Sequence, residues 1–159
     1  MWQAVHSTMY SVMGLSTPSR EKFIALLPKL YERKVLTREQ TVKGISSFLH
    51  IFDDFVVDVP LLAGHFSTIL ATLFVNDVFE GDVRFITTLP EENDFTMSMK
   101  MMSVIVQTAM IVKSLSTEEK AMEFYKSALD VEKIDEMQKE LLTEAIEKFD
   151  AQFLQVHNT

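Results

Sequence analysis

The sequence predicts an all-α protein of about seven helices that stack as antiparallel hairpins. Two observations carry this prediction. The 159 residues include only 4 Gly and 4 Pro, too few for a β protein with many turns. In addition, apolar side chains recur every three or four residues through most of the chain, which is the spacing of one helix face.

Start and stop signals in the sequence predict the first two helices. We expect the first helix over Trp2 to Met13, ended by the turn chemistry of residues 14–18. The second should begin near Ser19, at the start of an apolar stripe with helical spacing. Pro28 lies inside this stripe and has no N–H, so the second helix should bend or end early there.

A capping box marks the start of the third helix. The Thr37 hydroxyl can accept the Gln40 N–H while the Gln40 side chain returns to the Thr37 N–H. The apolar pattern that follows runs to an acidic stop at residues 53–54. Asp58 then restarts the chain as the N-cap of a fourth helix, whose apolar face begins at Leu62.

The second half of the chain begins with a connector at residues 79–88, which is apolar enough for a short helix or a packed loop. Residues 89–94 contain proline and four polar or acidic side chains, so they should break the helical pattern. A long apolar helix is expected over residues 95–115. Residues 116–119, Ser-Thr-Glu-Glu, form a second capping box for the helix after it.

The last helix is expected from about Val131 to Gln155, with Asp130 as its cap. Glu and Lys side chains occupy one face of this segment. The opposite face should be buried, and it carries Ile134, Met137, Leu141, Ala145, Phe149 and Phe153.

Composition narrows the functional class. The 15 Lys and Arg against 23 Asp and Glu give a formal charge of −8, which disfavours nucleic acid and favours basic partners. The chain has no Cys, which excludes disulfides, thiolate nucleophiles and cysteine zinc sites and favours a cytoplasmic location. We expect neither a secretory signal nor a membrane span, since no apolar run approaches the required ~20 residues.

The sequence contains none of the common catalytic, phosphate-binding or metal-binding motifs. It has no common phosphate-binding or nucleophile motif, and its four His residues lack the spacings of helical metal sites. We therefore expect no catalytic residue, no metal and no cofactor. One alternative stays open, because His50 precedes Asp53 and Asp54 closely enough for an acid–base pair or a small-molecule site.

The acidic connector at residues 52–60 has two interpretations. Its carboxylates, Asp53, Asp54 and Asp58, surround a short apolar segment between two well-marked helices. They can serve as turn formers and a helix cap while the valines fill the core. Composition alone favours this structural interpretation. The carboxylates can instead present a surface for cationic side chains, because guanidinium groups pair with carboxylates through two hydrogen bonds.

Family likeness favours the second interpretation. Residues 36–45, Leu-Thr-Arg-Glu-Gln-Thr-Val-Lys-Gly-Ile, followed by residues 53–60, resemble the signature of the MA-three domain. That domain occurs in the scaffold initiation factor 4 gamma and in programmed cell death protein 4. The likeness covers residues 1–79 as helical hairpins and continues more faintly as further helices over 80–159, closer to the scaffold. The first hairpin of the family is not visible, and Phe55 replaces a more common aliphatic residue.

The resemblance implies a fold, a partner and a site. In that family the domain is a HEAT-like, non-enzymatic stack that binds the DEAD-box RNA helicase initiation factor 4A, whose basic residues face an acidic loop. By position the matching carboxylates here are Asp54 and Asp58, with Asp53 beside them and Phe55 and Val57 for apolar contact. The implied function is a scaffold domain of cytoplasmic translation initiation that meets nucleic acid only through the complex. The alternative is an inhibitor that competes for the same helicase.

Overall fold

The structure is a computed structural model that describes residues 2–14, 16–58, 61–87 and 99–157, with the backbone alone at 53–58, 99–100 and 156–157. Within these ranges all regular structure is helical, as predicted. The seven α-helices are α1 (Trp2–Met13), α2 (Thr17–Glu32), α3 (Arg38–Asp58), α4 (Leu62–Val75), α5 (Met99–Leu115), α6 (Glu118–Ala128) and α7 (Glu136–Lys148). Three short 3-10 helices are η1 (Arg84–Ile86), η2 (Val131–Lys133) and η3 (Gln152–His157).

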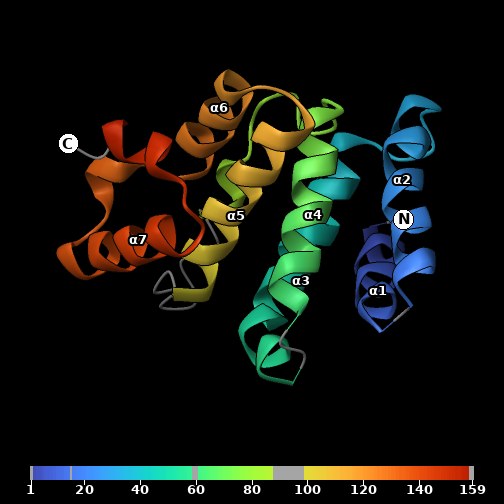
Figure 1. Ribbon diagram of the computed structural model, residues 1–159. Coiled ribbons are helices and arrows are strands. Elements are labelled where there is room, and N and C mark those ends of the chain that lie inside the picture. Colours follow the sequence, from blue (N-terminus) through green and yellow to red (C-terminus); the bar gives the residue numbers. More distant parts are fainter. Residues whose placement is uncertain (1, 15, 59–60, 88–98, 158–159) are drawn as a thin grey trace.

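The helices follow one another across the molecule, from α1 and α2 on one side to α6 and α7 on the other (Figure 1). α1 packs along α3, and α2 packs along α4, so the hairpin α1–α2 stacks on the hairpin α3–α4. The most extensive helix contact joins α4 to α5, which also packs against α6 and α7. The predicted stack of helical hairpins is therefore confirmed.

Phenylalanine side chains form the core between α3 and α4. The rings of Phe48 and Phe52 on α3 both contact the ring of Phe66 on α4, at centroid separations of 5.5 and 5.3 Å. All three side chains are buried. Because aromatic rings bury large areas in defined geometries, this cluster fixes the hairpin that carries the predicted site.

A glycine lets α1 approach α3 closely. A Cβ on Gly44 would lie 2.6 Å from Cβ and Cγ1 of Val5 and 3.0 Å from the carbonyl oxygen of Trp2, both on α1. The same interface brings Nδ1 of His6 within 2.8 Å of Oγ of Ser47. Packing, rather than backbone conformation, therefore requires glycine at position 44.

Side-chain caps start α3 and α6. The predicted box at α3 is confirmed: Gln40 N–H donates to Oγ1 of Thr37 at 3.2 Å, and Thr37 N–H donates to Oε1 of Gln40 at 3.1 Å. For α6 the predicted cap is wrong by one residue. Thr117, not Ser116, is the N-cap, and its Oγ1 accepts the Lys120 N–H at 3.1 Å. Ser116 and Thr117 are adjacent and both have a hydroxyl that can cap a helix, so the sequence alone does not choose between them.

Pro28 does not end α2. The helix begins at Thr17 and runs through Pro28 to Glu32. Of the two predicted effects of Pro28, an early end is therefore wrong, and a bend stays a prediction. Pro28 and its neighbour Leu27 are buried. Their burial offsets the backbone hydrogen bond that proline cannot make.

Three helices end in the same way, with a residue other than glycine in the left-handed region. These residues are Lys34 after α2 (φ 59°), Asp77 after α4 (φ 58°) and Asp150 after α7 (φ 54°). In each case the next N–H donates back to a carbonyl in the last helical turn: Val35 to Leu30 at 2.9 Å, Val78 to Leu73 at 3.0 Å and Ala151 to Ile146 at 2.9 Å. This Schellman geometry usually takes glycine.

The connector after α4 is packed rather than open. Val83 and Ile86, at η1, are fully buried, and the Val83 N–H donates to Oγ of Ser127 at 2.9 Å. Of the two alternatives, a short helix is the one that forms. The predicted breaker at 89–94 and the predicted helical residues 95–98 lie outside the described residues.

The predicted last helix is interrupted twice. Asp130 caps η2, whereas α7 starts in a separate capping box of Asp135 and Gln138 and ends at Lys148 before η3. The continuous helix over 131–155 is therefore wrong, because local caps at both ends compete with the apolar pattern.

The buried face of α7 also differs from the prediction. Leu142, Ala145 and Ile146 are buried, and only Ala145 was expected there. Met137 is 57% exposed. The other expected core residues are half-buried, and these are Ile134, Leu141, Phe149 and Phe153. Adjacent leucines at 141 and 142 fit either face, so the pattern alone does not decide the rotation of α7.

Candidate functional site

The predicted site lies in the last turns of α3. This helix continues through Asp58, so Asp53, Asp54, Phe55, Val57 and Asp58 belong to a helical backbone. The predicted acidic loop is therefore wrong for these residues. Their side chains, and residues 59–60, lie outside what the structure describes.

Two adjacent carboxylates do not stop α3 because the core holds the preceding turns. Phe48 and Phe52 are 0% and 1% exposed, and both pack on α4. Aspartate in a helix interior costs only about 0.7 kcal/mol relative to alanine. The burial of two phenylalanines outweighs that cost.

Asp58 is not the N-cap of α4. That position belongs to Leu61, and α4 begins at Leu62. The predicted capping role of Asp58 is wrong, because Asp58 is the last residue of the preceding helix.

The helical backbone groups the acidic residues. Asp54 and Asp58 are four residues apart, so they lie on one face of α3. The last turn of α3 contains no basic residue. A helix C-terminus carries partial negative charge, so each carboxylate placed there opposes the helix dipole by about 0.3–1 kcal/mol. The aspartates at positions 53–58 thus belong to the negative end of the α3 helix dipole.

His50, the residue of the alternative small-molecule site, is exposed on α3, one turn before Asp53 and Asp54. Among the residues that the structure describes, no group of three or more His, Asp and Glu side chains is arranged to hold a metal ion. The small-molecule alternative at His50 stays a hypothesis.

The sequence analysis missed a clasp at the start of α3. Arg38 donates from Nε to the carbonyl oxygen of Phe79 at 3.0 Å and from Nη2 to that of Asp82 at 3.2 Å. Arg84 donates to the Asp82 carboxylate at 3.0 and 2.8 Å, and these bonds lower the pKa of Asp82 to about 2. Arg38 binds carbonyls some forty residues away, so no local sequence signal reveals this clasp.

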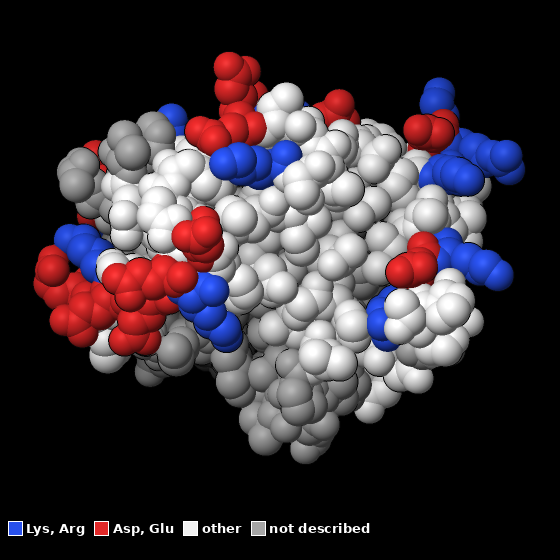
Figure 2. All heavy atoms as spheres, viewed as in Figure 1, with Lys and Arg blue, Asp and Glu red and all other residues white. Residues whose placement is uncertain are grey.

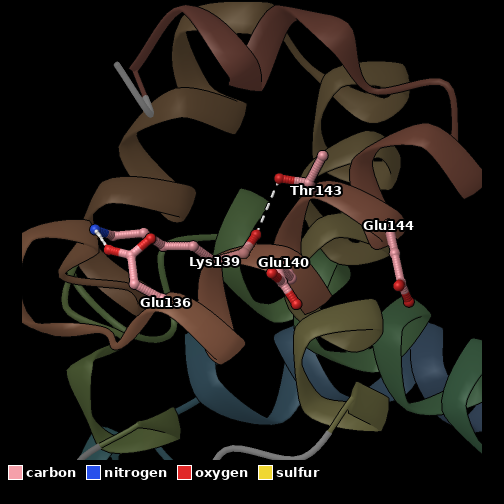
Figure 3. A pocket seen from close by; sticks show the side chains of 5 residues that line it. All are labelled: Glu136, Lys139, Glu140, Thr143 and Glu144. Atoms are coloured by element: carbon pink, nitrogen blue, oxygen red, sulfur yellow. Dashed lines mark hydrogen bonds and ion pairs between the residues drawn. The ribbon is translucent and has the colours of Figure 1, made fainter.

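An acidic face runs along α7. Figure 3 shows Glu136, Glu140 and Glu144 at successive turns, where they line a shallow depression with Lys139 and Thr143. Nζ of Lys139 lies 2.7 Å from Oε1 of Glu136, and the Thr143 hydroxyl donates to the Lys139 carbonyl at 2.9 Å. All five residues come from one helix, so the depression is an open groove rather than an enclosed ligand site.

Charge is distributed unevenly over the molecule. Residues 116–159 hold 11 of the 23 acidic side chains but only 5 of the 15 basic ones, so they contribute −6 of the net −8. In Figure 2 the acidic side chains gather over α6 and α7, the basic ones gather near α2, and the face over α4 and α5 is largely uncharged. In Figure 1 the last turns of the α3 backbone lie away from α6 and α7.

Comparisons with known proteins identified no relative of this chain. No protein-family model, curated protein or solved structure matches this chain. Among the described helices, none is both long and apolar enough to cross a bilayer.

Proposed function

We propose that this chain is a non-enzymatic protein–protein interaction domain that binds a DEAD-box RNA helicase through the end of α3. Its role is that of a scaffold in cytoplasmic translation initiation. The observation that carries the proposal is the placement of Asp54 and Asp58 on one face at the negative end of α3. The resemblance of residues 36–60 to the MA-three signature supplies the identity of the partner.

The physical basis of binding is charge pairing at a helix end. Arg and Lys side chains of the partner pair with the carboxylates and also interact favourably with the helix dipole. Such a contact accelerates association and weakens as ionic strength rises. A domain that binds one helicase conformation more tightly shifts the helicase cycle by that difference in affinity.

Charge-neutral variants test this site. Asp54→Asn and Asp58→Asn should each weaken helicase binding, measured by calorimetry with the purified helicase, by about tenfold, the effect of about 1.4 kcal/mol. Each should also raise the free energy of unfolding by about 0.3–1 kcal/mol, because it removes a carboxylate from the wrong end of a helix. If either carboxylate instead stabilised the fold, its replacement would lower the free energy of unfolding.

Glu144→Gln is the matched control, because it makes the same change in net charge on the exposed face of α7. It should leave helicase affinity unchanged. If both aspartate variants bind as tightly as the parent chain, the proposed site is wrong. If the parent chain does not bind the helicase at all, the proposed function is wrong.

The same contact also fits an inhibitor. An RNA-unwinding assay separates the two roles, since a scaffold maintains or raises helicase activity and an inhibitor lowers it. The assay uses the parent chain with Asp54→Asn and Asp58→Asn as binding-deficient controls.

A further inference from the structure

One face of α2 carries a basic stripe, although the net charge of the protein is −8. The stripe consists of Lys22, Lys29 and Arg33, all exposed, and it includes the exposed Leu26. Arg33 is the C-cap residue, and its N–H still donates to the Lys29 carbonyl oxygen at 3.0 Å, so it continues the helical spacing. At about 100° per residue the four side chains lie within about 60° of one another, opposite the buried residues of α2.

The described part of the chain provides no ion-pair partner for the basic stripe. Every ion pair that the structure describes uses other cations, which are Arg38, Arg84, Lys113, Lys120, Lys133 and Lys139. Lys22, Lys29 and Arg33 are therefore exposed and unpaired within the described residues, on the side of α2 that faces away from α4. Their charges can pair only with another molecule.

A complementary acidic stripe lies on α7. It consists of Glu136, Glu140 and Glu147, all exposed, on the side of α7 opposite its buried residues. Figure 3 shows Glu136 and Glu140 at successive turns of this face, followed by Glu144. Glu136 pairs with Lys139 of its own helix at 2.7 Å, whereas Glu140 and Glu147 form no ion pair among the described residues.

The two stripes match in length and in spacing. Each extends over eleven residues, about 16 Å along a helix axis. The basic stripe, followed backwards along the chain, has intervals of four and then seven residues, and the acidic stripe, followed forwards, has the same intervals. Two helices laid side by side in antiparallel orientation therefore bring opposite charges together three times. The pairs are Arg33 with Glu136, Lys29 with Glu140 and Lys22 with Glu147.

One copy of the protein cannot pair its own stripes. α2 and α7 lie at opposite ends of the helical stack, α2 against α4 and α7 against α5 (Figure 1). We infer that the basic stripe of α2 docks the acidic stripe of a second copy, head to tail. Each contact leaves one stripe of either kind available, so copies add into an open chain or close into a ring. This inference does not depend on the proposed function.

The mass of the protein in solution tests the contact. Exposed ion pairs are individually weak, so association requires a high chain concentration. At about 0.1 M ionic strength the Debye length is about 10 Å, which screens the repulsion between the net charges of two copies more than it weakens ion pairs in contact. Sedimentation equilibrium of the full chain should then show a mass that rises with concentration. At about 1 M ionic strength the mass should return to the 18.2 kDa of one chain.

Charge reversal at the central pair identifies the two faces. Lys29→Glu and Glu140→Lys should each weaken association by about tenfold or more, because each places like charges opposite one another. An equimolar mixture of the two variants should associate as the parent does, because opposite charges then meet at both kinds of contact. Both variants keep a net negative charge, so net charge does not explain the recovery. Lys126→Glu, the same change at an exposed residue of α6, is the matched control and should associate like the parent.

Each outcome decides the inference. A parent chain that stays monomeric at every concentration overturns it, as does association that persists at about 1 M ionic strength. Association that neither reversal weakens, or variants that do not recover on mixing, would show that the two stripes do not bind each other. If the parent is monomeric but binds a single-stranded RNA oligonucleotide, and Lys29→Glu abolishes this binding, the basic stripe serves a polyanion and the inference is wrong.

Discussion

Replacing Gly44 by alanine should destabilise the protein, although alanine has the higher helix propensity. The propensity term favours Gly44→Ala by about 0.5–1 kcal/mol. Against this, the new Cβ would lie 2.6 Å from two Val5 side-chain atoms and 3.0 Å from the Trp2 carbonyl oxygen. Contacts this short force α1 away from α3, and overpacking of a core costs about 1–3 kcal/mol. We expect a net loss of about 1–2 kcal/mol.

The same substitution at Gly64 should have the opposite effect on the free energy of unfolding. It lies inside α4, and a Cβ there would meet Nε2 of Gln107 at 3.6 Å, an ordinary van der Waals distance. Only the propensity term remains, so Gly64→Ala should raise the free energy of unfolding by about 0.5–1 kcal/mol. The pair compares the same substitution at a helix position that another helix approaches closely and at one in the first turn of α4.

Urea unfolding followed by far-ultraviolet circular dichroism measures both variants, with equal m-values as the check on two-state behaviour. For a domain of this size each kcal/mol corresponds to about 2–4 °C in melting temperature. A Gly44→Ala variant as stable as the parent, or more stable, would refute the close approach of α1 to α3.

Three further predictions address α7, the helix ends and the clasp. Leu142→Ala should lower the free energy of unfolding by about 2–5 kcal/mol, and Leu141→Ala by less because that side chain is half-buried; the reverse order in urea would contradict the observed rotation of α7. Lys34→Gly should stabilise the protein by about 1 kcal/mol, since glycine adopts φ 59° without a Cβ clash; a lower melting temperature would contradict this. Asp82, with its pKa lowered to about 2, contributes stability above about pH 4 that is lost as pH falls towards 2. Asp82→Asn should therefore lower the free energy of unfolding, measured in urea, by under about 1 kcal/mol, because this ion pair is exposed. The difference from the parent should vanish by about pH 2. A difference that does not depend on pH would contradict the prediction.

Local chemistry predicted the helices whose ends are set by nearby residues. The first helix occupies Trp2–Met13 as expected, and the Thr37–Gln40 box starts α3 because both hydrogen bonds span only three residues. Prediction failed where distant contacts compete with a local signal. The helix α2 does not end at Pro28, because burial offsets the missing donor, and α7 turns a different face to the core than its apolar pattern indicates.

The candidate site shows the same division. The sequence determined which residue types gather at positions 53–58 and therefore the charge that a partner meets. It did not determine whether they form a loop, because aspartate is a weak helix breaker whose behaviour depends on the packing of the preceding turns. Phe48 and Phe52, held against Phe66, carry α3 through Asp58.

The all-α class and most helix positions thus follow from the sequence by itself, through periodicity, caps and the scarcity of glycine and proline. Only the tertiary structure decided which helices pack together, that Gly44 is a contact point, and that Leu61 stays exposed while Leu62 is buried. The reason is physical. Backbone capping acts over three or four residues, whereas the burial of one leucine rather than its neighbour depends on the surface that another helix brings against it.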